Sequence, residues 1–297
     1  MNARKQYGPA KRPDTGGGLP FARMHGCGND FVVIDDRAGS WHARREALAR
    51  EVCDRRRGLG GDGLVLIQSG GDGTDFRMTY VNRTGMDGEM CGNAARCTVL
   101  RATQFGLIGS GGTMATEAGP IEATIVGNIV ALKMTPPVDE RPPLDLEVDG
   151  NRTEGWAIDT GVPHVVIFLD DEPALDALDV ERIGRALRHH DAFAPRGVNA
   201  NFAAQRGDGS FRMRTYERGV EMETLACGTG AVAVGLMAHR RFGSPAPVRI
   251  HPTGGGLLEI GFQATPDGRF TDVTLAGPAE LIAEGEISAA WLAAHGL

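Results

Sequence analysis

Short apolar stretches, many of them alternating with polar residues, recur along the chain and have the length of β-strands. They predict strands over 31–35, 64–68, 76–82, 113–117, 121–125, 129–134, 156–160, 164–169, 198–203, 211–216, 248–251, 257–262 and 270–275. Apolar residues at helical spacing predict helices over 44–55, 91–105, 180–188 and 227–241, and a short helix from Ile287. Mostly antiparallel strands with few helices indicate the α+β fold class.

One predicted helix, 227–241, has an unusual composition. Between Ala231 and Ala238 it carries no charged side chain. A helix of this kind has to be buried on nearly all sides. A sheet wrapped around the helix satisfies that requirement, so we expect strands arranged as a barrel around it.

Two stretches of the chain resemble each other, Phe76–Arg96 and Phe211–Ala233. Both begin with Phe-Arg-Met, continue through Thr-Tyr, and end in Cys-Gly followed by small residues. Aligned on Cys91 and Cys227, they differ by one inserted residue. The repeat distance is too long for a solenoid. It predicts two pseudo-symmetric domains, each a mostly antiparallel strand barrel around a central helix.

Proline-rich segments suggest where these domains meet. Thr135-Pro136-Pro137 and Arg141-Pro142-Pro143 interrupt the strand pattern and predict a linker. We therefore expect an N-terminal domain over 21–135, completed by 273–297, and a C-terminal domain over 136–272. Residues 1–20 are polar and rich in Gly and Pro, which predicts a flexible extension outside the fold.

Composition narrows the function classes. The 297 residues are 41% hydrophobic and 23% charged, as in ordinary soluble proteins, and suggest two domains. A net charge of -7 argues against nucleic acid as a partner. The longest apolar run, 225–238, is too short to cross a membrane, and no secretory apolar region follows Met1. We expect a cytoplasmic protein with no membrane partner.

The five cysteines are Cys27, Cys53, Cys91, Cys97 and Cys227. An odd number of cysteines argues against a disulfide framework and suits a reducing compartment. Zinc fits poorly, because Cys91 and Cys97 lack C-x-x-C spacing and no His lies close to Cys91 or Cys227. Cys53 and Cys97, inside predicted helices, and Cys27, in a glycine turn, are best interpreted as small buried apolar residues.

Lysine is nearly absent, which bears on cofactors. Only Lys5, Lys11 and Lys133 occur, and no glycine-rich phosphate loop lies near Lys133. A pyridoxal phosphate enzyme requires a buried Schiff-base lysine. We therefore expect neither a cofactor nor a metal.

Cys91 and Cys227 each lie at the predicted start of a helix. Such a position presents unpaired N–H groups and a partial positive charge, which lower a thiol pKa and bind carboxylates. Two such thiols on either side of one carbon suit stereoinversion of an amino acid, in which one thiolate removes the α-proton and the other thiol returns one. The alternative for each cysteine, a buried apolar role, does not explain why both occupy the same point of a repeat.

Several stretches carry a resemblance to a known family. They are His25–Phe31, Asp54–Leu64, Asn82–Arg96, Gly161–His164, Val198–Phe202 and Tyr216–Gly230. On these residues the chain resembles the diaminopimelate epimerases, cofactor-independent enzymes of lysine and peptidoglycan precursor synthesis. The resemblance implies a ligand site in a cleft between two barrel domains. It also implies that Cys91 donates and Cys227 accepts the proton when the LL isomer reacts.

The resemblance implies roles for further residues. His164 and Glu217 are expected to tune the cysteine pKa values. The expected substrate-binding residues are Asn29, Asn82, Gly92, Asn93, Asn199, Glu217, Arg218, Gly228 and Thr229. Apart from the resemblance, the asparagines are typical turn formers, a histidine after proline is typically structural, and a Glu-Arg pair is typically solvated. Only Arg218, which can grip a carboxylate bidentately, favours a binding role unaided.

The chain departs from the family pattern at three positions. Val162 and Gly63 replace amide residues that contact the substrate in the family, and Thr274 replaces an aromatic near the subunit interface of the family homodimer. A racemase or epimerase of the same fold acting on proline or hydroxyproline is therefore an alternative. A thiol redox or metal-binding module, with Cys91 and Cys227 as a dithiol, is another.

Overall fold

The computed structural model describes residues 17–88 and 90–297, whose contacts divide them into two units. Unit 1 comprises the residues up to Gly26, together with 30–130 and 279–297, and unit 2 comprises 27–29 and 131–278. The sequence placed these boundaries after 135 and after 272. Of the predicted N-terminal extension, residues 1–16 lie outside the described residues, and Leu19 and Pro20 belong to the first strand.

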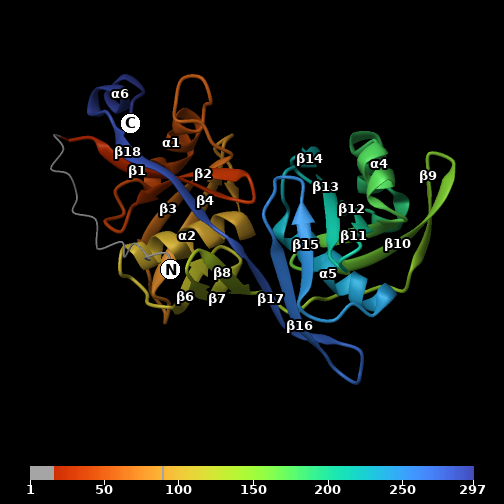
Figure 1. Ribbon diagram of the computed structural model, residues 1–297. Helices are drawn as coiled ribbons and strands as arrows, with labels where there is room; N and C mark the ends of the chain where they lie inside the picture. Colours follow the sequence, from red (N-terminus) through yellow and green to blue (C-terminus); the bar gives the residue numbers. More distant parts are fainter. Residues whose placement is uncertain (1–16, 89) are drawn as a thin grey trace. The chain divides into compact units, whose positions relative to one another are not determined.

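The described part of unit 1 is built from short strands and a few helices (Figure 1). Its strands are β1 (Leu19–Gly26), β2 (Asn29–Asp35), β3 (Gly63–Ser69), β4 (Phe76–Asn82), β5 (Asp87–Gly88), β6 (Gly111–Thr116), β7 (Gly119–Val126) and β18 (Glu280–Ile287), and β8 (Ile129–Lys133) runs across its boundary. Its helices are α1 (Arg45–Val52), preceded by the 3-10 turn η1 (His42–Arg44), α2 (Gly92–Gln104) and α6 (Ala289–Ala294).

Helix α2 is the central helix of unit 1. It packs against β1, β3, β4 and β7. Its residues from Gly92 to Val99 are buried, and Arg96 is among them. Helix α1 is joined to β2 and β3 by an apolar cluster that includes Leu48, Val32 and Leu66. Burial of α2 on several sides places its first turn at a fixed point in the unit.

Unit 2 has the same kinds of element (Figure 1). Its strands are β9 (Leu144–Val148), β10 (Asn151–Asp159), β11 (Pro163–Leu169), β12 (Asn199–Gln205), β13 (Phe211–Glu217), β14 (Met222–Thr224), β15 (Val248–Pro252), β16 (Leu258–Ala264) and β17 (Phe270–Pro278). Its helices are α3 (Glu172–Ala177), α4 (Val180–Arg188) and α5 (Gly228–Phe242), and η2 (Asp191–Phe193) is a 3-10 turn.

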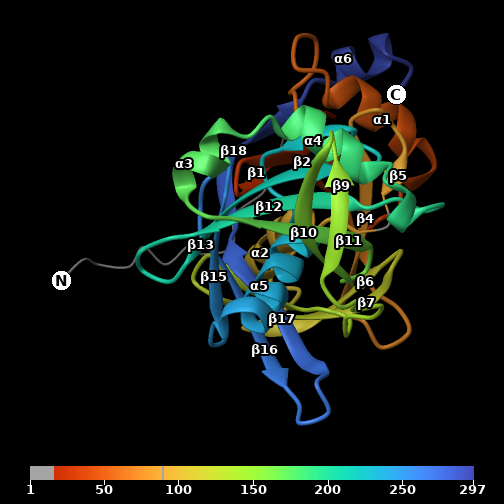
Figure 2. The same ribbon diagram turned by 90° about the vertical axis from the view of Figure 1, so that its right-hand side faces the viewer.

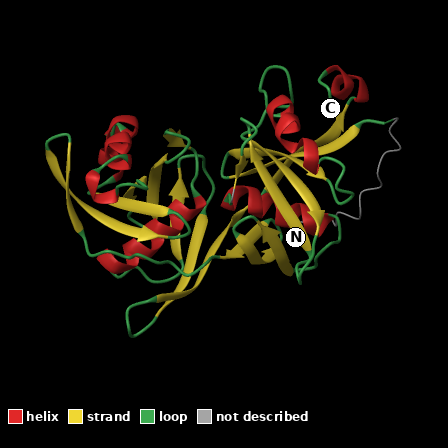
Figure 3. Cartoon of the chain, turned by 180° about the vertical axis from the view of Figure 1, so that it is seen from behind, coloured by secondary structure: helices red, strands yellow, loops and turns green. Residues whose placement is uncertain are grey.

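Helix α5 is the central helix of unit 2, packed by β10, β11, β12, β13, β15, β16 and β17 (Figure 2). Every residue from Ala231 to Ala238 is buried, as the absence of charge predicts. Gly235 allows a close approach to the sheet, because a Cβ atom there would lie 2.8 Å from Cβ of Ile260. The predicted fold class, α+β with strands around a central helix in each half, is confirmed. Strands, drawn in yellow in Figure 3, predominate over the helices, drawn in red.

The two units share their strand pairing. In unit 1, β2 and β3 are parallel, β3 and β4 antiparallel, and β4 and β6 parallel. In unit 2, β11, β12, β13 and β15 follow the same sequence of directions. The registers also agree, since Phe76 pairs with Met114 where Phe211 pairs with Ile250. In each unit the third of these strands, β4 or β13, is followed along the chain by a short strand and then by the central helix. The sequence repeat is therefore also a structural repeat.

This register defines equivalent positions in the two units. Phe31 pairs with Gly63 across β2 and β3, and His164 pairs with Asn199 across β11 and β12. His164 is therefore the counterpart of Phe31, and Asn199 of Gly63. Counting from the shared Phe-Arg-Met, Glu217 at the end of β13 is the counterpart of Asn82 at the end of β4.

Among the described residues, strands β1, β5, β9, β14 and β18, helix α3 and the 3-10 turn η2 were not predicted. Strand β18 pairs with β1, but most of its side chains are exposed, so it lacks an apolar face that alternation could reveal. Strand β1 lies next to the glycine-rich segment that predicted a flexible extension, and β9 follows the proline-rich segment that predicted a linker. Helix α3 is only six residues long. Within the described residues, no helix combines the length and apolar character needed to cross a bilayer.

Candidate active site

Cys91 and Cys227 occupy the same position in their units, the N-cap of the central helix. Their backbone angles nearly coincide, with φ -136° and ψ 114° at Cys91 and φ -114° and ψ 112° at Cys227. Each carbonyl accepts the first helical hydrogen bond, from Ala95 N–H and Ala231 N–H, at 2.9 Å in both cases. Each thiol therefore lies at the positive end of a helix dipole, where a thiolate or a carboxylate is stabilised.

The Cys227 side chain is buried and closely surrounded. Its Sγ accepts a hydrogen bond from Gly230 N–H at 3.4 Å and lies 3.5 Å from the Thr229 hydroxyl. Cys91 is more exposed than Cys227. The two thiols thus share a backbone setting but differ in solvation.

Glu217 lies beside the Cys227 thiol. It ends β13, and its carboxyl forms hydrogen bonds with the Thr224 hydroxyl and with the Cys227 side chain. Burial raises the pKa of the Glu217 carboxyl, and these two hydrogen bonds offset only part of that effect. A carboxyl in contact with a thiol can exchange a proton with it.

Arg218 follows Glu217, and its backbone is held by Asn199. The Arg218 N–H donates to Asn199 Oδ1 at 2.7 Å, and its guanidinium donates to the Arg196 carbonyl at 3.3 Å. Glu221 fixes the same loop by accepting the Gly219 N–H at 3.0 Å. While its amide oxygen holds the loop, Asn199 can offer its amide nitrogen to a ligand as a hydrogen-bond donor.

His164 is the second residue of β11 and is buried. Burial, with a smaller contribution from the positive charge of Arg218, lowers the pKa of His164 to about 3. The ring is therefore neutral at physiological pH. The turn before it is tied to the first turn of α5, because the Thr160 hydroxyl donates to the Thr229 carbonyl at 2.9 Å.

The lowered pKa of His164 makes a prediction about acid stability. A depressed pKa contributes stability above the unfolded-state value near 6.5, and this stability is lost as the pH falls toward 3. Between pH 7.5 and 5.5 the wild type should lose about 1.4 kcal/mol more unfolding free energy than His164→Phe, which cannot titrate. Urea unfolding at the two pH values measures this difference; equal losses in both proteins would contradict it.

In unit 1, the Asn82 side chain builds a turn. Its Oδ1 accepts hydrogen bonds from the backbone N–H groups of Thr84, at 2.9 Å, and Met86, at 3.2 Å, and from the Thr84 hydroxyl at 2.6 Å. These three bonds leave the amide nitrogen of Asn82 for a ligand. Asn82 thus fulfils the turn-forming role that its residue type predicts, whatever it binds.

Gly92 and Asn93 form the first turn of α2, directly after Cys91. The Asn93 side chain is buried, and its Oδ1 accepts a hydrogen bond from the Arg96 guanidinium at 2.8 Å. The same guanidinium donates to the Gly92 carbonyl at 3.2 Å. Sequence reasoning missed Arg96, a fully buried cation one turn from Cys91, although a charge within a run of small residues was a visible signal.

Residues 27 and 28 form the turn between β1 and β2, and residues 27–29 group with unit 2. Gly28 has a φ of +83°, and a Cβ atom there would lie 2.9 Å from the Gly254 carbonyl oxygen. Cys27 is buried, as expected, with a positive φ of 54°. Asn29 follows as the first residue of β2.

The structure gives a physical reason for Gly63. A Cβ atom at this position would lie 2.5 Å from Cε2 of Tyr80, and one at Gly88 would lie 2.4 Å from Cδ1 of the same ring. The Tyr80 ring therefore occupies the space that a longer side chain at position 63 would need. In place of the amide that the resemblance led us to expect at this position, there is an aromatic ring held between two glycines.

The predicted site residues divide between the units. Unit 1 holds Asn82, Cys91, Gly92 and Asn93, and unit 2 holds Asn29, His164, Asn199, Glu217, Arg218, Cys227, Gly228 and Thr229. Within unit 2, hydrogen bonds join Cys227 to Glu217, and Thr229 to the turn before His164. Unit 2 therefore has a thiol, a carboxyl, an imidazole and a guanidinium around the start of one helix.

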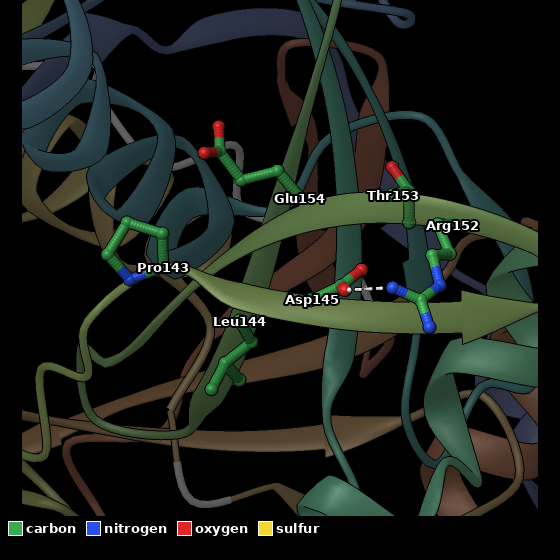
Figure 4. A pocket seen from close by; sticks show the side chains of 6 residues that line it. All are labelled: Pro143, Leu144, Asp145, Arg152, Thr153 and Glu154. Atoms are coloured by element: carbon green, nitrogen blue, oxygen red, sulfur yellow. Dashed lines mark hydrogen bonds and ion pairs between the residues drawn. The ribbon is translucent and has the colours of Figure 1, made fainter.

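A surface pocket of about 320 Å³ lies elsewhere in unit 2, on the hairpin of β9 and β10 (Figure 4). Its lining residues are Pro143, Leu144, Asp145, Arg152, Thr153 and Glu154. Arg152 and Asp145 neutralise each other across it at 3.0 Å. None of the predicted site residues lines this pocket, so it is separate from the candidate active site.

Known proteins resemble this chain in sequence and in fold. The sequence model described as Diaminopimelate epimerase matches residues 21–138 and 156–279. A diaminopimelate epimerase from Hydrogenobaculum sp. is 38% identical over 278 residues, which are 90% of this chain and 98% of that protein. One from Chlorobaculum tepidum is 40% identical over 272 residues, covering 89% of this chain and all of that protein.

Among solved structures, the Bacillus anthracis phenazine biosynthesis protein of the PhzF family has a TM-score of 0.71 at 14% identity, covering 92% of this chain and 99% of its own. This likeness shows the shared fold. The family match and the identity of the relatives, over nearly their full length, show more than the fold. The chain belongs to the diaminopimelate epimerase family.

Proposed function

We propose that the protein inverts one stereocentre of LL-2,6-diaminopimelate to give meso-diaminopimelate, without a cofactor, in the cytoplasmic synthesis of lysine and peptidoglycan precursors. The observation that carries this proposal is the matching geometry of Cys91 and Cys227 at the N-termini of equivalent helices. Relatives of nearly equal length named diaminopimelate epimerase support the choice of substrate.

The two proton transfers of the proposed reaction use the two cysteine side chains, one as a thiolate and the other as a thiol. From the LL isomer, the Cys227 thiolate takes the α-proton and becomes a thiol, and the electron pair of the C–H bond stays on the substrate. The Cys91 thiol then gives its proton to the opposite face of the α-carbon and becomes a thiolate. No proton is gained or lost overall, and the reverse reaction exchanges the two roles.

The α-carboxylate gains negative charge as the proton leaves. N–H groups in the first turns of the two helices, those of Gly92 and Asn93 and of Gly228 and Thr229, would stabilise that charge. These donors are already oriented by the helices, so no reorganisation is needed during the reaction. Glu217, in contact with Cys227, would hold or release the proton of that thiol.

The other end of the substrate carries an ammonium and a carboxylate. Arg218 is the cation suited to bind this carboxylate, since a guanidinium can form two parallel hydrogen bonds. Asn29, Asn82 and Asn199 would contribute amide contacts. The amide oxygens of Asn82 and Asn199 already accept hydrogen bonds from the protein, so we expect their N–H groups to face the substrate carboxylate.

Exchange of the α-proton in deuterated water tests this proposal. With LL- or meso-diaminopimelate, we expect deuterium to enter the α-position while the two isomers interconvert, as followed by mass spectrometry and chiral chromatography. L-proline and trans-4-hydroxy-L-proline should show neither exchange nor inversion. Turnover of these amino acids but not of diaminopimelate would establish the alternative racemase. Disulfide exchange without any isomerisation would establish the redox module instead.

A further inference from the structure

A chain of three buried polar side chains crosses strands β13, β12 and β11 of unit 2. The Thr215 hydroxyl donates to Asn201 Oδ1 at 3.1 Å. The amide nitrogen of Asn201 lies 3.1 Å from Nδ1 of His164. Thr215, Asn201 and His164 are all at most 2% exposed. Burying this many polar groups is costly unless each is satisfied, so the arrangement calls for an explanation.

The hydrogen bonds determine which nitrogen of His164 carries the proton. The amide nitrogen of Asn201 also lies 3.1 Å from the carbonyl oxygen of Val165, which can only accept a hydrogen bond. The NH₂ group of Asn201 therefore faces this side and donates to His164 Nδ1 as well. An Nδ1 atom that accepts cannot carry hydrogen in a neutral ring, which places the proton on Nε2.

The Nε2–H group of His164 is then a donor without a partner. Nε2 is buried, and within residues 17–88 and 90–297 it has no hydrogen-bond partner. A buried donor left unsatisfied destabilises the fold, which indicates that its partner is supplied by a ligand. The positive charge of Arg218 acts on the same ring, so an anionic acceptor is favoured there.

Unit 1 shows that the fold itself does not need these polar groups. Across the equivalent strands β2, β3 and β4, the counterparts of His164, Asn201 and Thr215 are Phe31, Val65 and Tyr80. Phe31 and Tyr80 pack edge to face, with ring centroids 5.9 Å apart. The same strand framework is thus stable with apolar packing, and the polar chain is a feature of unit 2 alone.

We propose that Asn201 is a positioning residue that holds His164 in the neutral Nε2–H form, so that this buried N–H donates to a carboxylate of the bound amino acid. The choice of ligand rests on the proposed function, whereas the choice of tautomer rests on the hydrogen bonds of Asn201. His164 in this state donates a hydrogen bond without transferring its proton. Thr215 supports Asn201 by fixing which end of the amide faces the ring.

Nitrogen NMR of protein labelled with ¹⁵N-histidine tests the tautomer directly, because protonated and unprotonated ring nitrogens resonate far apart. The His164 signals are assigned by their loss in His164→Phe. In the wild type we expect one protonated Nε2 and one unprotonated Nδ1, unchanged from pH 8 to pH 5. In Asn201→Asp, whose side chain can only accept when ionised, the proton should move to Nδ1. A wild-type proton on Nδ1, or an unchanged tautomer in Asn201→Asp, would overturn the proposal.

Ligand binding tests the second half of the proposal. Adding meso-diaminopimelate should shift the Nε2–H signal of the wild type but produce no such signal in Asn201→Asp. Asn201→Leu should lower kcat/KM on the order of tenfold to a hundredfold, and should add little further loss to His164→Phe, because both remove the same hydrogen bond. Thr215→Val, which keeps the side-chain volume, provides a second variant if Asn201→Leu does not fold. Thr215→Val should lower kcat/KM less than Asn201→Leu does, and its His164 ring should give the NMR signals of both tautomers.

The outcomes separate this inference from the proposed function. If diaminopimelate is not epimerised but the tautomer responds to position 201 and a tested amino acid shifts Nε2–H, only the substrate assignment fails. If diaminopimelate is epimerised while no substrate shifts the Nε2–H signal, the role of His164 as a carboxylate donor is wrong.

Discussion

Replacing either Cys91 or Cys227 with alanine is expected to lower kcat for diaminopimelate epimerisation by about 10³- to 10⁴-fold, which is the upper range for losing a positioned acid or base. Each thiol serves one face of the α-carbon, so neither can substitute for the other. Both helices should persist without their cysteines, because the backbone carbonyls of Cys91 and Cys227 accept the first helical hydrogen bonds. Cys227→Ala also removes the hydrogen bond from Gly230 N–H to the thiol, which is one cap of a helix packed on several sides.

Isotope exchange should distinguish the two variants. Cys227→Ala keeps Cys91, which can still remove and return a proton at the meso isomer, so deuterium should enter meso- but not LL-diaminopimelate. Cys91→Ala should show the opposite preference. Mass spectrometry of each isomer after incubation in deuterated water measures both reactions, and equal exchange from both isomers in one variant would rule out the assigned faces.

Cys97→Ala is the matched control for these experiments. Cys97 lies on α2, six residues after Cys91, and is fully buried. Its replacement should lower stability through lost packing but leave kcat within about twofold, since it has no role in proton transfer. A loss of activity in Cys97→Ala as large as in Cys91→Ala would mean that perturbation of α2, rather than loss of a thiol, explains the result.

Glu217→Gln should lower kcat by about 10²-fold, because a carboxyl in contact with a reacting thiol acts as an acid or base and an amide cannot. The hydrogen bond to Thr224 can be kept by the amide oxygen, so the loop should stay in place. Glu217 titrates with a raised pKa in the folded protein, so the acidic limb of the kcat profile should disappear or move in the variant. Initial rates measured across pH give the comparison.

The same substitution should change how stability depends on pH. A carboxyl with a raised pKa contributes stability below its unfolded-state value near 4.5, and this contribution is lost as the pH rises through the folded-state value. Glu217→Gln lacks this loss, so its Tm relative to the wild type should increase between pH 4.5 and pH 8. Thermal unfolding followed by circular dichroism measures the trend, and a constant difference in Tm would mean that Glu217 does not titrate as described.

Glu223→Gln serves as the control for Glu217→Gln. Glu223 lies on β14 and forms an ion pair with Arg214 at 2.7 Å. Its replacement removes a carboxyl from the neighbouring strand and keeps Glu217. We expect its kcat and pH profile to match those of the wild type.

Most of the fold was predictable because its elements carry strong patterns. The charge-free run of α5 predicted burial on all sides, and the Phe-Arg-Met repeat predicted equivalent strands in two units. Strand β18 was not predictable, since pairing with β1 gives it hydrogen bonds but little buried side-chain surface. Pairing of this kind depends on residues far apart in the chain, which no local pattern records.

The candidate site was predictable only in part. The two cysteines are marked by the repeat itself, and the structure places both at helix starts. Asn201 and Thr215 were missed because each looks like an ordinary strand residue until the register brings them together with His164. The lack of space around Gly63 was not predictable either, because the ring that excludes a longer side chain there belongs to Tyr80, seventeen residues later.

The matching registers of the two units are what a tandem duplication of an ancestral half-sized gene leaves behind. Strand order and the N-cap cysteine, which both copies kept, record what the ancestor already had. The pairs Phe31 and His164, Gly63 and Asn199, and Asn82 and Glu217 mark where the descendants diverged. At these pairs the chemistry of the two units differs while strand order and register are the same, as expected if a symmetrical ancestor specialised to handle an asymmetric reaction.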